Sequence, residues 1–495
     1  MKTLKALTLL ITVSFLTTSC FKDNDDNLIS ANEINDFVWK GMNAFYLYKD
    51  NVPNLANDRF SSDEAYADYL NTFSKSESLF ESLIHQSETV DRFSWIVNDY
   101  IALEQMFSGI STSNGMEFNL YTHPNNSNTV FGVVTYVLPN TSAESQNVKR
   151  GDLFHEIDNT QLTANNYTSL LSSDSYTINL GGYNTNGTAE TNDDTIVPNN
   201  ETKSLTKSQY TENPILVKNV LDVDGTKIAY LMYNGFTGTN QFNTELNNAF
   251  GEFKSANATE LVLDLRYNPG GSVNTAILLA SMITGQFTGD VFSTEQWNAE
   301  FQQALENEDP ELLINRSVNN NGGAPLHSLN LNKVYVLTTK RSASASELVI
   351  NSLKPYIDVI QIGTTTAGKY QASTTLYDSS NFRREGANPN HTYAMQPLIF
   401  KSLNVNGVTD YFNGLSPNSD NTLNESINNF GVLGDINEPL LAAAIAKIQG
   451  SGRIAKQKTN AIRPLYNIID SHPFGSGMYT DKELPTNIIK RILFE

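Results

Sequence analysis

Residues 342–346 hold three serines that alternate with alanines, and a lone glycine–lysine pair follows further along the chain, at residues 368–369. The serines come just after an apolar strand-like run, Val334–Leu337, and begin a helix-like segment that Pro355 ends. A serine at this place has its hydroxyl beside free N–H groups and the positive end of the helix dipole, which would stabilise an oxyanion. The alternative is that these serines only cap the helix, as serines commonly do.

A second candidate segment is LVLDLRYNPGG, residues 261–271. A buried strand, Leu261–Leu265, runs into a turn that contains Gly270 and Gly271. Adjacent glycines let backbone N–H groups approach a bound oxygen closely, so the turn can supply half of an oxyanion hole. Glycines are as often needed only for the turn, and this segment alone is weak evidence.

The elements around these two segments predict an α/β core. From residue 227 onward, strand-like runs such as KIAYLMYNGF and KVYVLTTK alternate with helical patterns of about ten residues, such as NTAILLASMITG. This alternation is typical of βαβ units and a largely parallel sheet. Both candidate turns follow strands, so we expect them at the carboxyl edge of that sheet, where such folds carry their sites.

The chain before this core divides into two further regions. Apolar residues at spacings of three and four predict helices over residues 30–107. Short strands with turn signals follow from residue 108, including a strand, helix, RGD, strand order around residues 130–157. Residues 165–215 are rich in Asn, Thr and Gly, which predicts a weakly ordered loop or hairpin.

The segments DLRYNPGG, SASASE and TTTAGK, in this order, resemble the motifs of the C-terminal processing peptidases, the S41 family of serine proteases. The resemblance extends over nearly the whole chain after its N-terminal segment. It implies a crotonase/ClpP-like βαβ protease core with a PDZ-like β-rich domain and an α-helical N-terminal domain. The expected boundaries are residues 1–19 for a signal peptide, 20–29 for an acidic tether, 30–107 for the helical domain, 108–200 for the PDZ-like domain, 215–450 for the core and 451–495 for a tail.

The resemblance also implies roles for individual residues. Ser344 corresponds to the nucleophile of this family, and Lys369, 25 residues later, corresponds to the general base. A lysine acts as a base only when it is unprotonated, so burial must lower its pKa from about 10.4 toward neutrality. The N–H groups of Ala345 and of Gly270 or Gly271 correspond to the oxyanion hole.

The chain departs from the family pattern next to the lysine. Many members carry a glutamine four residues after it that orients the amine, whereas here Ser373 stands at that place and Gln371 lies two residues after the lysine. An aspartate that some members carry eleven residues after the nucleophile is replaced by Pro355. The orienting residue is therefore left open between Gln371 and Ser373.

Two functions follow from these observations. The intact Ser344 and Lys369 favour a serine endopeptidase that hydrolyses protein substrates through an acyl-enzyme; the missing glutamine favours a catalytically inactive peptide-binding or scaffolding protein. A crotonase-type acyl-group enzyme would leave the PDZ-like segment and the lysine spacing unexplained. None of the six histidines falls in these motifs, so a Ser-His-Asp arrangement has little support.

The β-rich region has alternatives of its own. PDZ domains bind extended peptides at a sheet edge, and in related proteases they recognise substrate C-termini and gate the active site. A purely structural lid, or an unrelated small β-barrel, also fits the pattern of short strands.

The N-terminus has the features of a targeting segment. Lys2 and Lys5 precede the apolar run ALTLLITVSFL, which is too short to span a bilayer, and Cys20, the only cysteine, follows LTTS. This resembles the lipobox of a bacterial lipoprotein, and the acidic FKDNDDN after it resembles a surface-export signal of the Bacteroidetes type. An ordinary secretory signal and a solvated linker are the alternatives. We expect a lipid anchor at Cys20 and a location in the cell envelope, at the outer membrane, facing the periplasm or the surface.

Composition limits the remaining partners. With 33 Lys and Arg against 53 Asp and Glu, the formal net charge is −20, which repels phosphate backbones and argues against a nucleic-acid binder. No cysteine or histidine cluster predicts a metal site, and the expected mechanism needs no cofactor. The predicted partners are protein or peptide substrates and, through Cys20, the membrane; the oligomeric state is left open.

Overall fold

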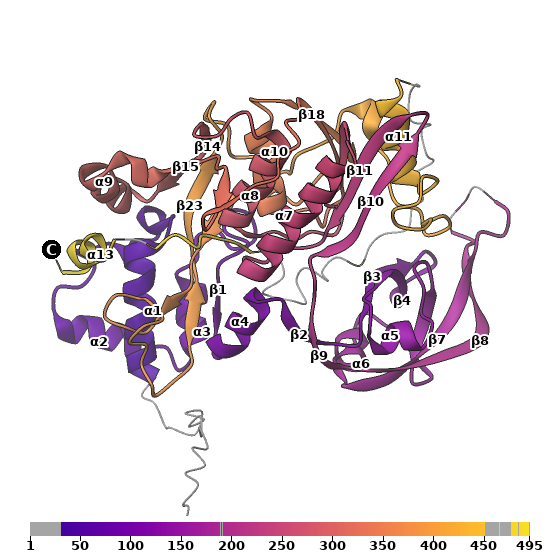
Figure 1. Cartoon of the computed structure of the whole chain (residues 1–495). Coiled ribbons are helices and arrows are strands. Elements are labelled where there is room, and N and C mark those ends of the chain that lie inside the picture. The colour runs from indigo at the N-terminus through magenta and orange to yellow at the C-terminus, as the bar shows by residue number, and fades with distance from the viewer. Residues whose placement is uncertain are drawn as a thin grey trace, which may run out of the picture.

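The computed structural model describes residues 31–450 except Ala189 and Thr191, together with Leu465, residues 477–483 and residues 485–494. The predicted signal peptide, tether and Cys20 lie outside these residues. Figure 1 shows a helical N-terminal part at the lower left, a β-rich part at the lower right, and an α/β core above them. The predicted α/β fold class with a helical N-terminal region is thereby confirmed.

The core is built on a five-stranded sheet with the order β10-β11-β12-β18-β19. The last four strands run parallel, and β10 pairs antiparallel with β11. The strands are β10 (Ile215–Val223), β11 (Thr226–Tyr233), β12 (Glu260–Asp264), β18 (Lys333–Thr338) and β19 (Asp358–Gly363). Helices α7 (Asn240–Ser255), α8 (Val273–Thr284) and α10 (Ala345–Leu353) connect them as the alternating pattern predicts.

Both faces of this sheet are buried. Successive strand residues point to opposite sides, and each side packs into its own apolar cluster. In β11, Ala229, Leu231 and Tyr233 pack in one apolar cluster with α7, α8 and α10. Ile228, Tyr230 and Met232 face a second cluster that includes α11 (Pro439–Ile448). The apolar helix near the end of the predicted core therefore covers the second face of the sheet.

A second core sheet stands beside the first, with the order β13-β24-β20-β23-β14-β15. Its strands are β13 (Gly271–Ser272), β24 (Met478–Tyr479), β20 (Gln371–Ser373), β23 (Leu398–Leu403), β14 (Val291–Trp297) and β15 (Ile314–Arg316). Strand β24 comes from the segment predicted to be the C-terminal tail. This tail contributes a strand to the core and a helix, α13 (Thr486–Phe494), that contacts α9 (Ala299–Glu308) and α1 (Ala31–Phe45).

The N-terminal part consists of α1, α2 (Asp63–Asn71), α3 (Ser76–Ser82) and α4 (Tyr100–Phe107). Apolar residues of α1, including Phe37, Val38 and Met42, belong to the main core cluster rather than to a cluster of their own. A short strand, β1 (Trp95–Val97), pairs with β22 (Ala394–Gln396), which pairs in turn with β21 (Leu376–Tyr377). The helical part is thus packed tightly onto the α/β core.

The β-rich part is a sheet of β3 (Met116–His123), β4 (Asn126–Val137), β5 (Leu153–Ile157), β7 (Ser175–Asn184) and β8 (Thr195–Thr206), with β6 (Thr160–Gln161) paired to β5. Short helices α5 (Ser142–Ser145) and α6 (Tyr167–Ser172) pack with it, and β2 (Ile110–Ser113) pairs with β9 (Ser208–Thr211). The strand and helix order agrees with the expectation, while its PDZ identity stays a prediction.

The polar stretch predicted to be a weakly ordered loop or hairpin is a hairpin, as one of the two alternatives expected. It is a long and regular antiparallel pair, β7–β8, and β8 continues past the domain boundary predicted at residue 200. Inward-facing apolar residues, Tyr176, Ile178, Leu180 and Leu205, anchor the hairpin in the domain core. They are too sparse along the chain to produce a visible hydrophobic pattern.

Candidate active site

The turn between β18 and α10 holds Ser344 in a strained conformation. Ser344 has φ 63° and ψ −113°, a region that residues other than glycine seldom adopt, and its side chain is fully buried. Within the described part of the chain, its Oγ has no hydrogen-bond partner. A strained serine on a sharp strand-to-helix turn is the arrangement that presents a hydroxyl for attack.

The neighbouring serines hold this turn against the loop after β12. Ser342 Oγ donates to Leu265 O at 2.8 Å, and Ser346 Oγ donates to Asn268 O at 3.0 Å. The Ala343 N–H also donates to Asn268 O. The outer two serines therefore bind the loop after β12, residues 265–271, which we call the glycine loop. The hydroxyl of the middle serine has no partner among the described residues.

The two glycines lie directly beside Ser344. A Cβ at Gly270 would be 2.6 Å from the Cβ of Ser344 and 3.1 Å from the nitrogen of Ala345. Ala345 is the first residue of α10, so its N–H has no acceptor within the helix. The Gly270 N–H, by contrast, donates to Asn268 Oδ1 at 2.9 Å. Of the two glycines predicted for the oxyanion hole, Gly271 is therefore the one whose N–H is not taken by Asn268.

Lys369 is almost fully buried, with 1% of its surface exposed. Burial lowers the pKa of its amine to about 7, although the charges of Asp91 and Glu347 act in the opposite direction. Its Nζ lies 4.9 Å from the centre of the Phe93 ring, a contact that favours the protonated form. A lysine with this pKa is available as a base near neutral pH.

Glu347, the glutamate of SASASE, joins the serine turn to the lysine loop. Its Oε2 accepts from the backbone N–H groups of Ser344 and Lys369, both at 2.8 Å. Its Oε1 accepts from Gly368 N and Thr366 Oγ1. Since two of the donors share one oxygen, the backbone nitrogens of Ser344 and Lys369 lie no further apart than twice that distance. Burial raises the pKa of Glu347, and these hydrogen bonds oppose the rise.

A segment of the N-terminal part also reaches the lysine loop. Arg92 Nη2 donates to Gly368 O at 3.2 Å, next to the Phe93 ring that covers the lysine amine. Asp91 is buried, and its carboxylate accepts from Tyr46 Oη and from the N–H groups of Phe93 and Ser94. The DRFS segment is therefore held rigidly where its carboxylate acts on Lys369.

The two residues predicted as alternatives for orienting the lysine are bound to other segments. Gln371 Nε2 donates to Tyr48 Oη at 2.8 Å, and its Oε1 has no hydrogen-bond partner among the described residues. Ser373 Oγ donates to Met478 O at 3.2 Å, in β24. The groups whose charges act on the amine are Asp91 and Glu347 instead.

Sequence reasoning missed Asp91, Phe93 and Glu347 as members of this site. Glu347 carried a signal, because a glutamate three residues after a serine at a helix start is the pattern of a capping interaction. The DRFS segment carried only a weak one, a charged pair with an aromatic residue between two helical stretches. Nothing local indicates that it docks onto a loop almost 280 residues later.

The described residues hold neither a cluster of metal ligands nor a membrane-spanning helix. In that part of the chain, no three or more His, Cys, Asp or Glu side chains gather in a way that could hold a metal ion. No helix there is both long and apolar enough to cross a membrane.

Comparison with known proteins identifies the family. Residues 227–387 match the model of Peptidase family S41, and residues 33–95 match that of the Peptidase S41 N-terminal domain. An S41 protease structure from Bacteroides fragilis NCTC 9343 is 25% identical, covers 84% of this chain and 97% of its own, and has a TM-score of 0.64.

More distant matches add nothing to this assignment. A photosystem II D1 C-terminal processing protease is 17% identical, covers 84% of this chain and 98% of its own, and has a TM-score of 0.46. None of the curated proteins matches the sequence significantly. The two family models and the structural match agree, and the chain holds a peptidase family S41 segment, residues 227–387, after an S41 N-terminal segment, residues 33–95.

Proposed function

We propose that this peptidase hydrolyses peptide bonds of protein substrates with Ser344 as the nucleophile and Lys369 as the general base. The observation that carries the proposal is the joint binding of both residues by Glu347, together with a pKa of about 7 for the lysine. A serine hydroxyl is a weak nucleophile at neutral pH and needs an adjacent base of this kind.

The reaction proceeds in two halves. Neutral Lys369 takes the proton of Ser344 Oγ, and the oxygen attacks the scissile carbonyl to form a tetrahedral oxyanion. The N–H groups of Ala345 and Gly271 donate to that oxygen. On collapse the C–N bond breaks, Lys369 gives its proton to the leaving amine, and an acyl-enzyme remains. Water, deprotonated by Lys369, then hydrolyses the ester and restores Ser344.

Burial supports this role for the lysine. A protonated ammonium at this place would have to be desolvated, which is unfavourable, so the neutral amine is populated near pH 7. The nearby carboxylates keep that pKa from falling further, which leaves the amine basic enough to accept the proton of serine.

The experiment measures cleavage of an unstructured protein such as casein by the parent chain and by Ser344→Ala, Lys369→Ala and Ser342→Ala variants, each confirmed to be folded by circular dichroism. We expect cleavage to vanish in the first two variants. Ser342→Ala removes a neighbouring hydroxyl that binds Leu265 O, so it should retain measurable activity. A folded parent chain that cleaves no substrate and is not labelled at Ser344 by a serine-reactive fluorophosphonate would favour the peptide-binding alternative.

We also propose that the enzyme is tethered to the cell envelope through a lipid on Cys20, with the acidic segment after it as a spacer. Labelling of cells with an alkynyl palmitate should mark the parent chain and not a Cys20→Ser variant. Absence of the label from both chains would leave an ordinary secretory signal as the better explanation.

A further inference from the structure

Strand β24 occupies an unusual place for a segment so near the C-terminus. It lies between β13, which is part of the glycine loop beside Ser344, and β20, which begins two residues after Lys369. Gly271 of β13 aligns with Met478, and Ser373 of β20 aligns with Tyr479. Both pairings are parallel. A short strand from a distant segment thus fills the gap between the nucleophile's loop and the base's strand.

The backbone of β13 has one side bonded to Phe236 and the other side facing β24. Gly270 O and Ser272 N are both bonded to the backbone of Phe236, at 2.8 Å each. Because successive backbone groups of a strand alternate in direction, the N–H and C=O of Gly271 face β24. The N–H that we propose for the oxyanion hole therefore points to the position that the β24 backbone occupies.

Contacts on the other side of β24 are the kind that bind any extended peptide. Thr480 N donates to Ser373 O at 3.0 Å, and Ser373 Oγ donates to Met478 O. These bonds use backbone atoms of the tail and require no particular side chain. Addition of a strand to a sheet edge is a general way of binding unfolded peptides.

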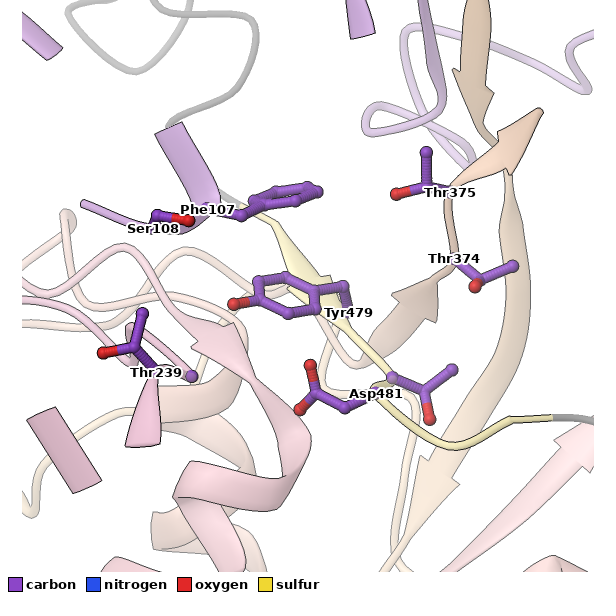
Figure 2. A pocket seen from close by; sticks show the side chains of 9 residues that line it. Phe107, Ser108, Thr239, Thr374, Thr375, Tyr479 and Asp481 are labelled. Atoms are coloured by element: carbon purple, nitrogen blue, oxygen red, sulfur yellow. The ribbon is translucent and has the colours of Figure 1, made fainter. Parts of the chain in front are cut away.

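A cavity of about 310 Å³ accompanies the strand (Figure 2). Its lining joins α4, the loop before α7 and the segment after β20 to the tail: Phe107, Ser108, Gly238, Thr239, Thr374, Thr375, Tyr479, Thr480 and Asp481. The Tyr479 ring packs against Phe107 with ring centres 4.5 Å apart, and Asp481 accepts from Ser272 Oγ. The cavity therefore provides room for side chains of a strand bound along this path.

We propose that the gap between β13 and β20 is the binding site for the substrate backbone. In the resting enzyme β24 fills this site, and a substrate must displace it in order to bind. The ligand is an extended peptide that runs parallel to β13 and carries an aromatic side chain where Tyr479 now meets Phe107. This proposal rests on the proposed peptidase function for its catalytic consequence, although the binding site itself does not need catalysis. The resting enzyme is inhibited by its tail, and substrates bind only when the tail leaves.

A disulfide bond that holds β24 against β20 tests whether β24 must be displaced before a substrate binds. In a chain that carries Cys20→Ser, the changes Ser373→Cys and Tyr479→Cys place two thiols on aligned residues of adjacent strands, within reach of a disulfide. The oxidised protein should lose casein cleavage, and reduction of the same sample should restore it. Equal activity in both forms, with the disulfide verified by mass, would overturn the proposal. The two single-cysteine variants control for the substitutions themselves.

A binding measurement tests the site without catalysis. The probe is a fluorescein-labelled peptide with the sequence of residues 476–483, SGMYTDKE, bound to chains that carry Ser344→Ala. Thr480→Pro removes the N–H that holds β24 to Ser373 O, whereas Thr480→Ala keeps it. Since the apparent affinity scales with the fraction of empty sites, a rise in that fraction from about one tenth to nearly all of the molecules would tighten binding about tenfold.

The outcomes of the two experiments separate the two proposals. Tighter binding of the probe by the Thr480→Pro chain than by the Thr480→Ala chain supports the site, even if no substrate is cleaved and the proposed function fails. Equal binding by both chains, with an active parent enzyme, overturns the site and leaves the function standing. A probe with alanine in place of tyrosine should bind more weakly, because it loses the Phe107 contact.

Discussion

At the scale of single residues, the site depends on two buried carboxylates, whose charges both raise the pKa of Lys369. Glu347 receives hydrogen bonds from the loops of both Ser344 and Lys369, and so it fixes their separation. Asp91 acts on the lysine through its charge. The first is a neighbour of the nucleophile in sequence, and the second comes from another part of the chain.

The pKa of Lys369 predicts the pH dependence of cleavage. The base works only when neutral, so kcat/KM should rise about tenfold per pH unit below pH 7 and level off above a midpoint of about 7. Rates measured from pH 5 to 10 in buffers of constant ionic strength check this. A Lys369→Arg variant should be inactive at every pH, because guanidinium stays protonated. A flat profile over this range would contradict the role of the lysine.

Removal of the Asp91 charge should move this profile. The carboxylate raises the pKa of Lys369, so Asp91→Asn should shift the midpoint of kcat/KM to lower pH. The amide keeps an oxygen for the N–H groups of Phe93 and Ser94, which preserves the fold. Asp58→Asn, an exposed change in the same part of the chain, should leave the midpoint in place. A midpoint that stays or rises in Asp91→Asn would refute the electrostatic role.

At the scale of elements, the glycine loop and the start of α10 form a close contact that tolerates no side chain. Gly270 has φ 116°, and a Cβ there would meet Ser344 and the Ala345 nitrogen. Gly270→Ala should therefore displace Ser344 and lower kcat about 100-fold. Gly386→Ala is the matched control, because Gly386 also has a positive φ but open space around it. Activity equal in both variants would show that the contact does not position the nucleophile.

The elements that sequence reasoning found are those with a local signal. Strands β11, β12 and β18 are continuous apolar runs because both faces of a parallel sheet are buried, and α7 and α8 have apolar residues at helical spacing. The serine turn and the lysine loop follow from their motifs. Strand β24 has only two residues, and the DRFS segment has no periodic pattern of apolar residues. The packing of β24 between β13 and β20, and of the DRFS segment against the lysine loop, could therefore not be predicted from the sequence. Their partners are set by tertiary contacts alone.

At the scale of the whole molecule, the β-rich part is tied to the core by a buried ionic cluster. Arg150, just after the predicted PDZ-like helix, lies 2.7 Å from Glu425, which lies 3.2 Å from Arg266. Arg266 also binds Asp264 and Glu438. Tyr136 stacks on Tyr267 at the same interface, with ring centres 5.5 Å apart. The β-rich part thus rests on the loop that leads to Gly270.

Loss of one partner of this cluster should loosen the two parts from each other. Arg150→Met leaves the buried Glu425 with fewer partners, and we expect a cost of about 3 kcal/mol in the free energy of unfolding. Chemical denaturation measures it, and limited proteolysis should show earlier cleavage in residues 114–206. Arg316→Met, which breaks an exposed pair with Glu311, should cost less than about 1 kcal/mol. Equal losses in both variants would mean that the cluster does not join the parts.

The dependence of Lys369 on the DRFS segment bears on how such enzymes can be recombined. The matched protease segment, residues 227–387, contains Ser344 and Lys369 but not Asp91 or Phe93. A protease core transplanted into another protein would keep both reacting groups and lose the charge and the ring that lie beside the lysine. A gene fusion that is to keep the environment of Lys369 must therefore transfer the helical part together with the core.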